Sequence, residues 1–230
     1  PALQIVLATY FECSGDNLAT TLSLPVDCLH VDLVRCPSQL GDILNHEDFV
    51  NGTTKLSLGL VDGRNIWKND FTNSLSFIEK ALSKLGEDRV WIAPSCSLLH
   101  TPYDLDLEKD ESVLTPTIKN WMAFAKQKLK EVRTLADLTK PQLFSSLASI
   151  LTENQQAIES RKSSTLIHRP TVKAQIQGIK NADFEREAPF TLRQSIQKEL
   201  LQLPLLPTTT IGSFPQTTDD ALQLALHASL

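Results

Sequence analysis

The alternation of strand-like and helix-like segments is the feature that most limits the folds open to this chain. Short apolar runs that predict strands end in polar or glycine-containing turns, and a helical pattern follows each of them. This unit occurs four times before residue 135, with predicted strands at residues 4–12, 29–34, 55–61 and 89–94. Repeated strand–helix units predict parallel strands joined by right-handed crossovers. We therefore expect four parallel strands, adjacent to one another and in chain order.

The predicted helices within this repeat differ in length. Residues 18–24 and 39–49 each favour a short helix, and residues 71–85 favour a longer one that ends at Gly86. Its apolar stripe, which should face the sheet, consists of Phe71, Leu75, Ile78, Leu82 and Leu85. After the fourth strand we expect one long helix with an apolar face made of Ile118, Trp121, Met122, Ala125, Leu129 and Val132.

The segment from residue 140 to 203 has a different character, because no further strand pattern interrupts it. Pro170 and Pro189 divide it into at least three helical pieces. Its apolar face is modest and consists of Leu143, Phe144, Leu147 and Ile150. We expect this segment to be a helical connector that serves packing and spacing.

Charge and residue content exclude several classes of protein. The chain of 230 residues has a formal net charge of -5 and is 41% hydrophobic, which suits a protein with a sizeable core that handles small molecules. General nucleic-acid binders and proteins of anionic membranes need a basic face. No apolar run approaches the length of a membrane span and no signal peptide is apparent, so we expect a cytoplasmic protein.

The cysteines and histidines do not fall into metal-ligand spacings. Cys13, Cys28, Cys36 and Cys96 form no CxxC pair, and we expect reduced, mostly buried thiols. The five histidines show no HxxxH spacing, and an isolated histidine at a strand end is more often a packed, hydrogen-bonded residue than a ligand. The sequence therefore predicts no metal site.

The stretch LPTTTIGSFPQT, residues 206–217, is unusually specific in composition. Pro207 favours an extended chain, residues 208–211 favour a strand, and Gly212 with Ser213 offers backbone N–H groups and a hydroxyl to a small polar ligand. On composition alone, a strand-to-loop linker is the better interpretation, and a ligand loop is the alternative.

Several motifs together resemble one family, the cobalamin-independent methionine synthases. LPTTTIGSFPQT is similar to the segment that opens the catalytic barrel of that family. The motifs LATYFECSGDNL, LHVDLVRCPSQL, LSLGLVDGRNIWKNDF and SCSLLHTPYDL occur in the same order as similar segments of its N-terminal domain. The resemblance covers most of residues 1–217.

The resemblance implies a fold and a division of the chain. The fold class is α/β, namely the last four βα units of a (β/α)8 TIM-type barrel followed by a helical inter-barrel connector. Residues 1–138 would be the partial N-terminal barrel, 139–203 the connector and 204–217 the opening strand of the catalytic barrel. Residues 218–230 do not match the family. The first four units of the barrel would lie upstream of residue 1.

Polar residues near the ends of the predicted strands are candidates for a site, because barrel enzymes place their chemistry at the carboxyl ends of strands. These residues are Glu12, Asp32, Asp62, Arg64, Cys96 and His100. Asp62 and Arg64 would belong to a polar rim that faces the other barrel or its folate, where Arg64 could pair with a carboxylate of the glutamate tail. The alternative, which we favour, is that residues 62–65 form a tight βα turn capped by Asp and Asn side chains. Cys96 is expected to be structural.

The resemblance also implies ligands and a cofactor. In the family, residues at the positions of Ile211, Gly212 and Ser213 contact the amino-acid part of homocysteine or methionine. The family enzyme uses zinc, whose ligands lie downstream of anything in this sequence. No catalytic residue and no metal ligand is therefore assigned here.

Two functions remain open at this stage. The chain is either part of a zinc-dependent methyltransferase that makes methionine from homocysteine and 5-methyltetrahydropteroyltriglutamate, or a non-catalytic remnant that acts as an interaction module. In the first case we expect the chain alone to be inactive. Neither function involves nucleic acid or a membrane.

Overall fold

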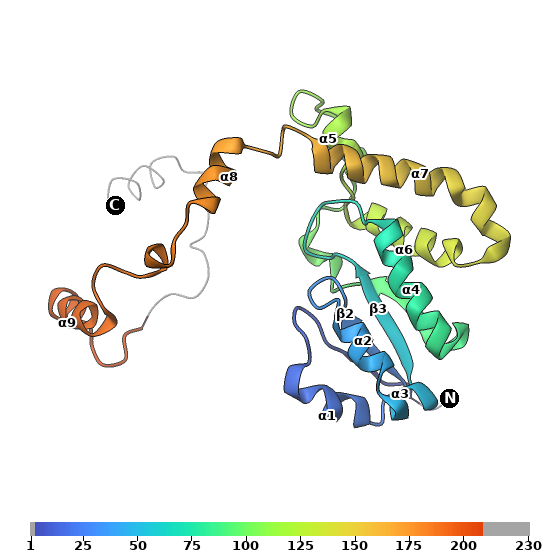
Figure 1. Cartoon of the computed structure of the whole chain (residues 1–230), viewed down its shortest axis with the longest axis horizontal. Coiled ribbons are helices and arrows are strands. Elements are labelled where there is room, and N and C mark those ends of the chain that lie inside the picture. Colours follow the sequence, from blue (N-terminus) through green and yellow to red (C-terminus); the bar gives the residue numbers. More distant parts are fainter. Residues whose placement is uncertain (1–2, 209–230) are drawn as a thin grey trace. The chain divides into compact units, whose positions relative to one another are not determined.

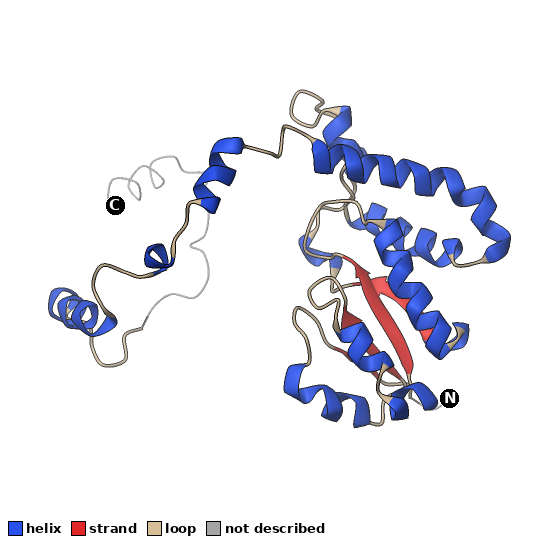
Figure 2. Cartoon of the chain, viewed as in Figure 1, coloured by secondary structure: helices blue, strands red, loops and turns tan. Residues whose placement is uncertain are grey.

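A computed structural model describes residues 3–208 of the chain. By its internal contacts the chain divides into two units, residues 1–169 and residues 170–230, and each is described by itself. The strands lie in the first unit, together with most of the helices (Figures 1 and 2). No helix among residues 3–208 combines the length and the apolar character needed to cross a membrane.

The first unit is built on one four-stranded sheet, in the order β1-β2-β3-β4, and every neighbouring pair is parallel. The prediction of four adjacent parallel strands in chain order is confirmed. The strands are β1 (Val6–Ala8), β2 (Cys28–Asp32), β3 (Lys55–Val61) and β4 (Val90–Pro94). The first strand is shorter at both ends than the predicted residues 4–12, and beyond it the backbone turns at Phe11, where φ is +82°.

The helices of the first unit follow the strands. They are α1 (Leu18–Ser23), α2 (Gln39–Leu44), α3 (Glu47–Asn51), α4 (Phe71–Leu85), α5 (Pro116–Asn120), α6 (Ala125–Leu138) and α7 (Pro141–Ser163). Short 3-10 turns occur at η1 (Gly15–Asn17), η2 (Glu87–Arg89), η3 (Leu98–His100) and η4 (Leu105–Leu107).

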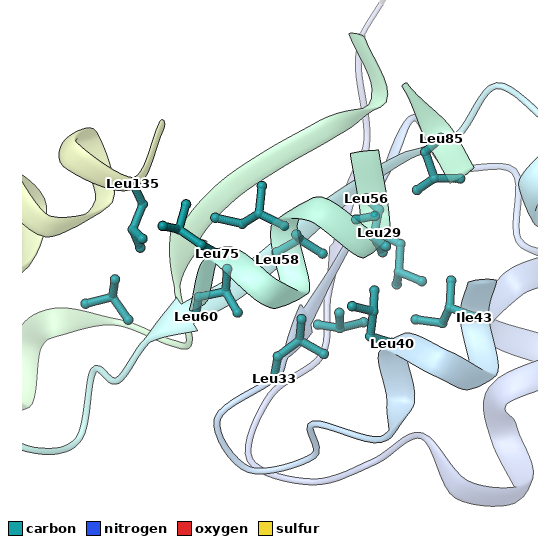
Figure 3. Close-up of a cluster of buried hydrophobic side chains, with 14 of the residues drawn as sticks. Leu29, Leu33, Leu40, Ile43, Leu56, Leu58, Leu60, Leu75, Leu85 and Leu135 are labelled. Carbon is teal, nitrogen blue, oxygen red and sulfur yellow. The ribbon is translucent and has the colours of Figure 1, made fainter. Parts of the chain in front are cut away.

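The core lies between the sheet and the helices that cover one of its faces. Alternate residues of β2 and β3 point into it, where they meet α2, α4 and α6 (Figure 3). From the sheet come Leu29, Val31, Leu56, Leu58 and Leu60, and from the helices come Leu40, Ile43, Leu75, Ile78, Leu85 and Leu135. Burial of these side chains is the main stabilising contribution in the unit.

Helix α4 has the predicted bounds and the predicted stripe. Its N-terminus is capped by the Asp70 carboxylate, which accepts a hydrogen bond from the N–H of Asn73 at 3.0 Å. It ends at Gly86, whose φ of +78° is a conformation that residues with a side chain rarely adopt. Four of the five stripe residues are buried, and the fifth, Leu82, packs at the edge of the core.

Two helix predictions were wrong. Residues 39–49 form two helices, α2 and α3, because the chain breaks at residues 45–46. The long helix predicted after the fourth strand is also two helices, since the buried segment 121–124 between α5 and α6 is not helical. Met122 forms an antiparallel bridge with Trp67, and this pairing replaces helical hydrogen bonds there. Leu129, predicted on the apolar face, is 59% exposed.

The segment predicted to be a connector, residues 140–203, is largely helical, and new helices begin at or directly after Pro170 and Pro189. Its role as a connector stays a prediction. In the first unit, α7 packs against α4 and α6. Its core-facing residues are Leu147, Leu151 and Ala157, whereas Phe144 and Ile150 from the predicted face are 45% and 38% exposed. The second unit contains α8 (Pro170–Gln177), η5 (Asn181–Phe184) and α9 (Phe190–Leu201), and none of its described residues is buried.

Candidate functional site

The carboxyl ends of the four parallel strands meet along one edge of the sheet, as the register of the pairs requires. The loops that leave this edge are residues 9–17, 33–38, 62–70 and 95–100. They contain five of the six polar residues predicted from strand ends, and the sixth, Asp32, is the last residue of β2. In parallel α/β proteins this edge is where ligands bind.

Asp32 holds two of these loops in place. It is 2% exposed. One carboxylate oxygen accepts a hydrogen bond from the N–H of Phe11 at 3.1 Å, and the other accepts from the N–H groups of Val34 and Arg35 at 3.0 Å. Because this carboxylate accepts hydrogen bonds from three backbone N–H groups in two loops, Asp32 fixes the position of the backbone at the strand edge.

Asp62 forms the tight turn that the sequence predicts. Its carboxylate accepts a hydrogen bond from the N–H of Arg64 at 2.7 Å and another from the side-chain amide of Asn65 at 2.7 Å. Asn65 in turn accepts from the N–H of Trp67 at 3.0 Å. The favoured interpretation of residues 62–65 as a capped βα turn agrees with these bonds.

Arg64 differs from its neighbours because its side chain is exposed. The guanidinium carbon lies 4.7 Å from the centroid of the Phe11 ring, a cation–π distance. Stacking leaves the N–H groups at the rim of the guanidinium available to an anion. A cavity of about 250 Å³ adjoins this turn and is lined by residues that include Leu33, Asp62 and Asn65.

The turn after β3 requires a glycine at position 63, because no side chain fits there. A Cβ atom there would lie 2.9 Å from the carbonyl oxygens of Cys96 and Ser97 and from the Cys96 sulfur. The N–H of Gly63 donates to the Ser95 hydroxyl at 3.2 Å. The turn after β3 and the loop after β4 are therefore in direct contact.

His30 is a packed, hydrogen-bonded residue, as expected of an isolated histidine. Its Nε2 lies 3.1 Å from the carbonyl oxygen of Ser95, so this nitrogen carries the hydrogen, and in the neutral ring Nδ1 accepts from the Ser57 hydroxyl at 3.0 Å. These contacts join β2, β3 and the end of β4 on the face of the sheet opposite the leucine core.

The remaining strand-end candidates do not assemble into a metal site. Glu12 and His100 are exposed, and Cys96 is partly buried, with its sulfur 3.7 Å from the carbonyl oxygen of Ser97. Within residues 3–208, no three His, Cys, Asp or Glu side chains come together as metal ligands.

The expectation of four reduced thiols is wrong for two of them. Cys13 and Cys36 form a disulfide, whereas Cys28 and Cys96 are free. The two bonded residues follow the adjacent strands β1 and β2, and their Cα atoms lie 5.3 Å apart, within the range that a disulfide needs. Sequence spacing alone did not indicate the pair, because parallel pairing of the strands brings the two loops together.

Two buried ionisable residues on α6 support the candidate site and were missed from the sequence. Lys128, 0% exposed, donates to Asn65 Oδ1 at 3.1 Å and to the carbonyl oxygen of Trp67 at 3.0 Å. Glu131 accepts from the N–H of Asn69 at 3.0 Å, and its other oxygen, buried, has no partner within the described part of the chain. Burial lowers the pKa of Lys128 and raises the pKa of Glu131 to about 7.

The spacing of these two residues was a usable signal. Lys128 and Glu131 share a helical face with Leu135 and Leu138, both of which are buried. Charged residues on an apolar stripe are unusual unless they are paired or hydrogen-bonded.

The predicted homocysteine contacts, Ile211, Gly212 and Ser213, lie outside the residues that the structure describes.

Comparison with known proteins gives consistent matches. Residues 1–86 match the family described as the N-terminal domain of cobalamin-independent synthase. The chain is 57% identical over 219 residues to a 5-methyltetrahydropteroyltriglutamate–homocysteine methyltransferase of Cytophaga hutchinsonii. It is 53% identical over 219 residues to the enzyme of that name from Flavobacterium johnsoniae, and 44% identical over 221 residues to that from Xylella fastidiosa.

The matches cover 95% of this chain and 28% of each relative. The chain thus spans about a quarter to a third of the length of the relatives that it matches. Identity of this degree, over nearly the whole chain and in agreement with the family match, places the chain in the cobalamin-independent methionine synthase family.

Proposed function

We propose that this chain works as part of a zinc-dependent methyltransferase that makes methionine from homocysteine and 5-methyltetrahydropteroyltriglutamate without cobalamin. Support comes from the names of relatives that are up to 57% identical, and from the match of residues 1–86 to the N-terminal domain of the family. The cytoplasmic location expected from the sequence is part of the same proposal.

The structural observation that supports substrate binding by this chain is the position of Arg64. Its backbone is fixed by Asp62, its ring partner Phe11 is fixed by Asp32, and its guanidinium remains exposed at the strand edge. An arginine held in this way can bind a carboxylate through two parallel hydrogen bonds. In this proposal Arg64 pairs with a carboxylate of the glutamate tail of the folate, and Asp62 maintains the turn.

The same proposal gives the chain its place in a larger fold. Four parallel strands in chain order, covered by helices on one face, are the arrangement of consecutive units in a (β/α)8 barrel. We propose that residues 1–138 are the last four units of such a barrel, that 139–203 connect it to a second barrel, and that 204–217 begin that barrel. In this scheme Ile211, Gly212 and Ser213 contact homocysteine.

The described residues do not fit a zinc site, since no three potential ligands come together among them. We therefore assign no step that involves the metal to residues 3–208. A thiol must be ionised to accept a methyl group, and the groups assigned here position substrates only. The isolated chain is expected not to form methionine.

Two assays test this proposal. The first measures methionine formed from homocysteine and 5-methyltetrahydropteroyltriglutamate, with zinc supplied, by this chain and by a longer chain that includes it. Turnover only by the longer chain is expected. Equal rates would show that the short chain is itself an enzyme, and activity in neither would favour a non-catalytic interaction module.

The second assay tests Arg64 in the longer chain. Arg64→Gln should raise the KM for the triglutamate substrate by about tenfold, the effect of losing one charge-assisted hydrogen-bond pair, and should raise the KM for the monoglutamate form less. The matched control is Lys84→Gln, which removes the same charge from the exposed face of α4. Equal KM changes for both substrates would contradict a role in binding the tail.

A further inference from the structure

The Cys13–Cys36 disulfide joins two loops at the strand edge that carries the candidate site. Cys13 lies in the loop after β1 and Cys36 in the loop after β2. The loop after β1 is also joined to the start of α2 by a hydrogen bond from the N–H of Ser14 to the side-chain carbonyl of Gln39, at 2.6 Å. Loss of the disulfide would therefore loosen this contact without removing every link between the loops.

The two sulfur atoms differ in access. Cys13 is exposed, whereas Cys36 is 2% exposed. The Ser38 oxygen lies 3.6 Å from the Cys36 sulfur, and since a disulfide sulfur carries no hydrogen, the hydroxyl is the donor. An incoming thiolate would meet the exposed residue Cys13 first, and the hydroxyl of Ser38 would stabilise the negative charge that develops on Cys36. Exposed disulfides of this kind are the ones that exchange readily with thiols.

The disulfide bears directly on how Arg64 is presented. Phe11, the aromatic partner of Arg64, lies two residues before Cys13 and has the left-handed φ of +82°. For a residue with a Cβ atom this conformation is unfavourable and persists only where surrounding contacts impose it. The contacts on Phe11 and its loop include the hydrogen bond to Asp32, the bond from Ser14 to Gln39 and the disulfide.

We propose that Cys13 and Cys36 are a thiol–disulfide modification site that controls the order of residues 9–17 and, through Phe11, the position of Arg64. The inference does not depend on the proposed methyltransferase function.

The exchange balances with a monothiol of the glutathione class as the reductant. Its thiolate attacks the Cys13 sulfur, the bond to Cys36 breaks, and the Cys36 thiolate leaves and takes a proton from water. A second glutathione-class thiolate attacks the mixed disulfide at the sulfur atom that came from the first one, and Cys13 is released as a thiolate. Two thiols are oxidised to one glutathione disulfide, and one protein disulfide is reduced to two thiols.

The test combines thiol counting with amide hydrogen exchange on the whole chain. Alkylation under denaturing conditions without reductant should label two of the four cysteines, Cys28 and Cys96, and prior treatment of the native chain with reduced glutathione should allow all four to be labelled. Reduction should speed exchange in peptides covering residues 9–17 by about tenfold or more, because a local tether is lost, and leave β3 unchanged.

Variants make the exchange result independent of the reductant. Cys13→Ser with Cys36→Ser should show the fast exchange of the reduced chain under all conditions, and the control Cys96→Ser should keep the redox response. Labelling of all four cysteines in chain exposed to glutathione disulfide would overturn the proposal. A native disulfide that resists glutathione, or exchange in residues 9–17 that does not change on reduction, would overturn it equally.

Discussion

Glu131 gives the sharpest prediction of pH dependence in this molecule. The residue is 7% exposed, one carboxylate oxygen accepts from the N–H of Asn69, and the other has no partner within the described residues. Burial, only partly offset by this hydrogen bond and by Lys128 and Lys68, raises its pKa from 4.5 to about 7. Between pH 4.5 and about pH 7, the folded protein therefore keeps a proton on Glu131 that the unfolded chain has lost.

The sign and the size of the effect follow from linkage. Because the folded state binds more protons between pH 4.5 and about 7, the free energy of unfolding decreases as the pH rises through this range, and becomes flat above it. One pKa unit corresponds to about 1.4 kcal/mol. Between pH 5 and pH 8, the free energy of unfolding should fall by about 2.5 kcal/mol through this single group.

The assay is urea unfolding at pH 5, 6, 7 and 8, followed by fluorescence, since Trp67, Trp91 and Trp121 all lie in the first unit. The variant Glu131→Gln keeps an oxygen for the same hydrogen bond and cannot ionise, so its free energy of unfolding should lack the decrease of about 2.5 kcal/mol. Glu153→Gln, an exposed carboxylate on α7, is the control and should behave like the parent chain. Parallel stability curves for the parent chain and Glu131→Gln would refute the reasoning.

Two further substitutions test contacts at the strand edge by the same unfolding assay. Gly63→Ala should cost about 1–3 kcal/mol, because its Cβ atom would clash with backbone oxygens, whereas Gly41→Ala on α2 meets no atom within 4 Å and should cost nothing; equal effects would contradict the close approach. Lys128→Met should cost about 1–3 kcal/mol because it removes two hydrogen bonds, those to Asn65 Oδ1 and to the carbonyl oxygen of Trp67, and it should cost more at pH 8 than at pH 5 as Glu131 ionises. Its control is the exposed Lys130→Met, and equal losses in the two variants would show that the buried bonds contribute little.

The sequence predicted the sheet well, because each strand and its helix carry a local signal. Alternating apolar residues in β2 and the stripe of α4 reflect burial against the same core, and both were found where expected. The capped turn at residues 62–65 was also predictable, because Asp and Asn side chains bond to backbone groups two residues along the chain.

What the sequence did not predict depends on contacts between distant segments. The break between α5 and α6 arises because Trp121 and Met122 pair with the loop after β3, more than fifty residues earlier. The disulfide depends on the parallel pairing of β1 with β2, and the orientation of Arg64 depends on Phe11. Helical periodicity describes a helix that already exists and does not report the backbone pairing that interrupts it.

The pairing between the loop after β3 and the segment between α5 and α6 has a consequence for evolution and for engineering. The N–H of Lys68 donates to the carbonyl of Trp121, and the N–H of Ala123 donates to the carbonyl of Ile66, both within 2.9 Å. Loops at the ends of strands in α/β proteins usually change length independently, which is why one scaffold supports many binding sites. Here a graft or deletion in either segment leaves backbone groups of the other unpaired, so the two segments can be exchanged between homologues only together.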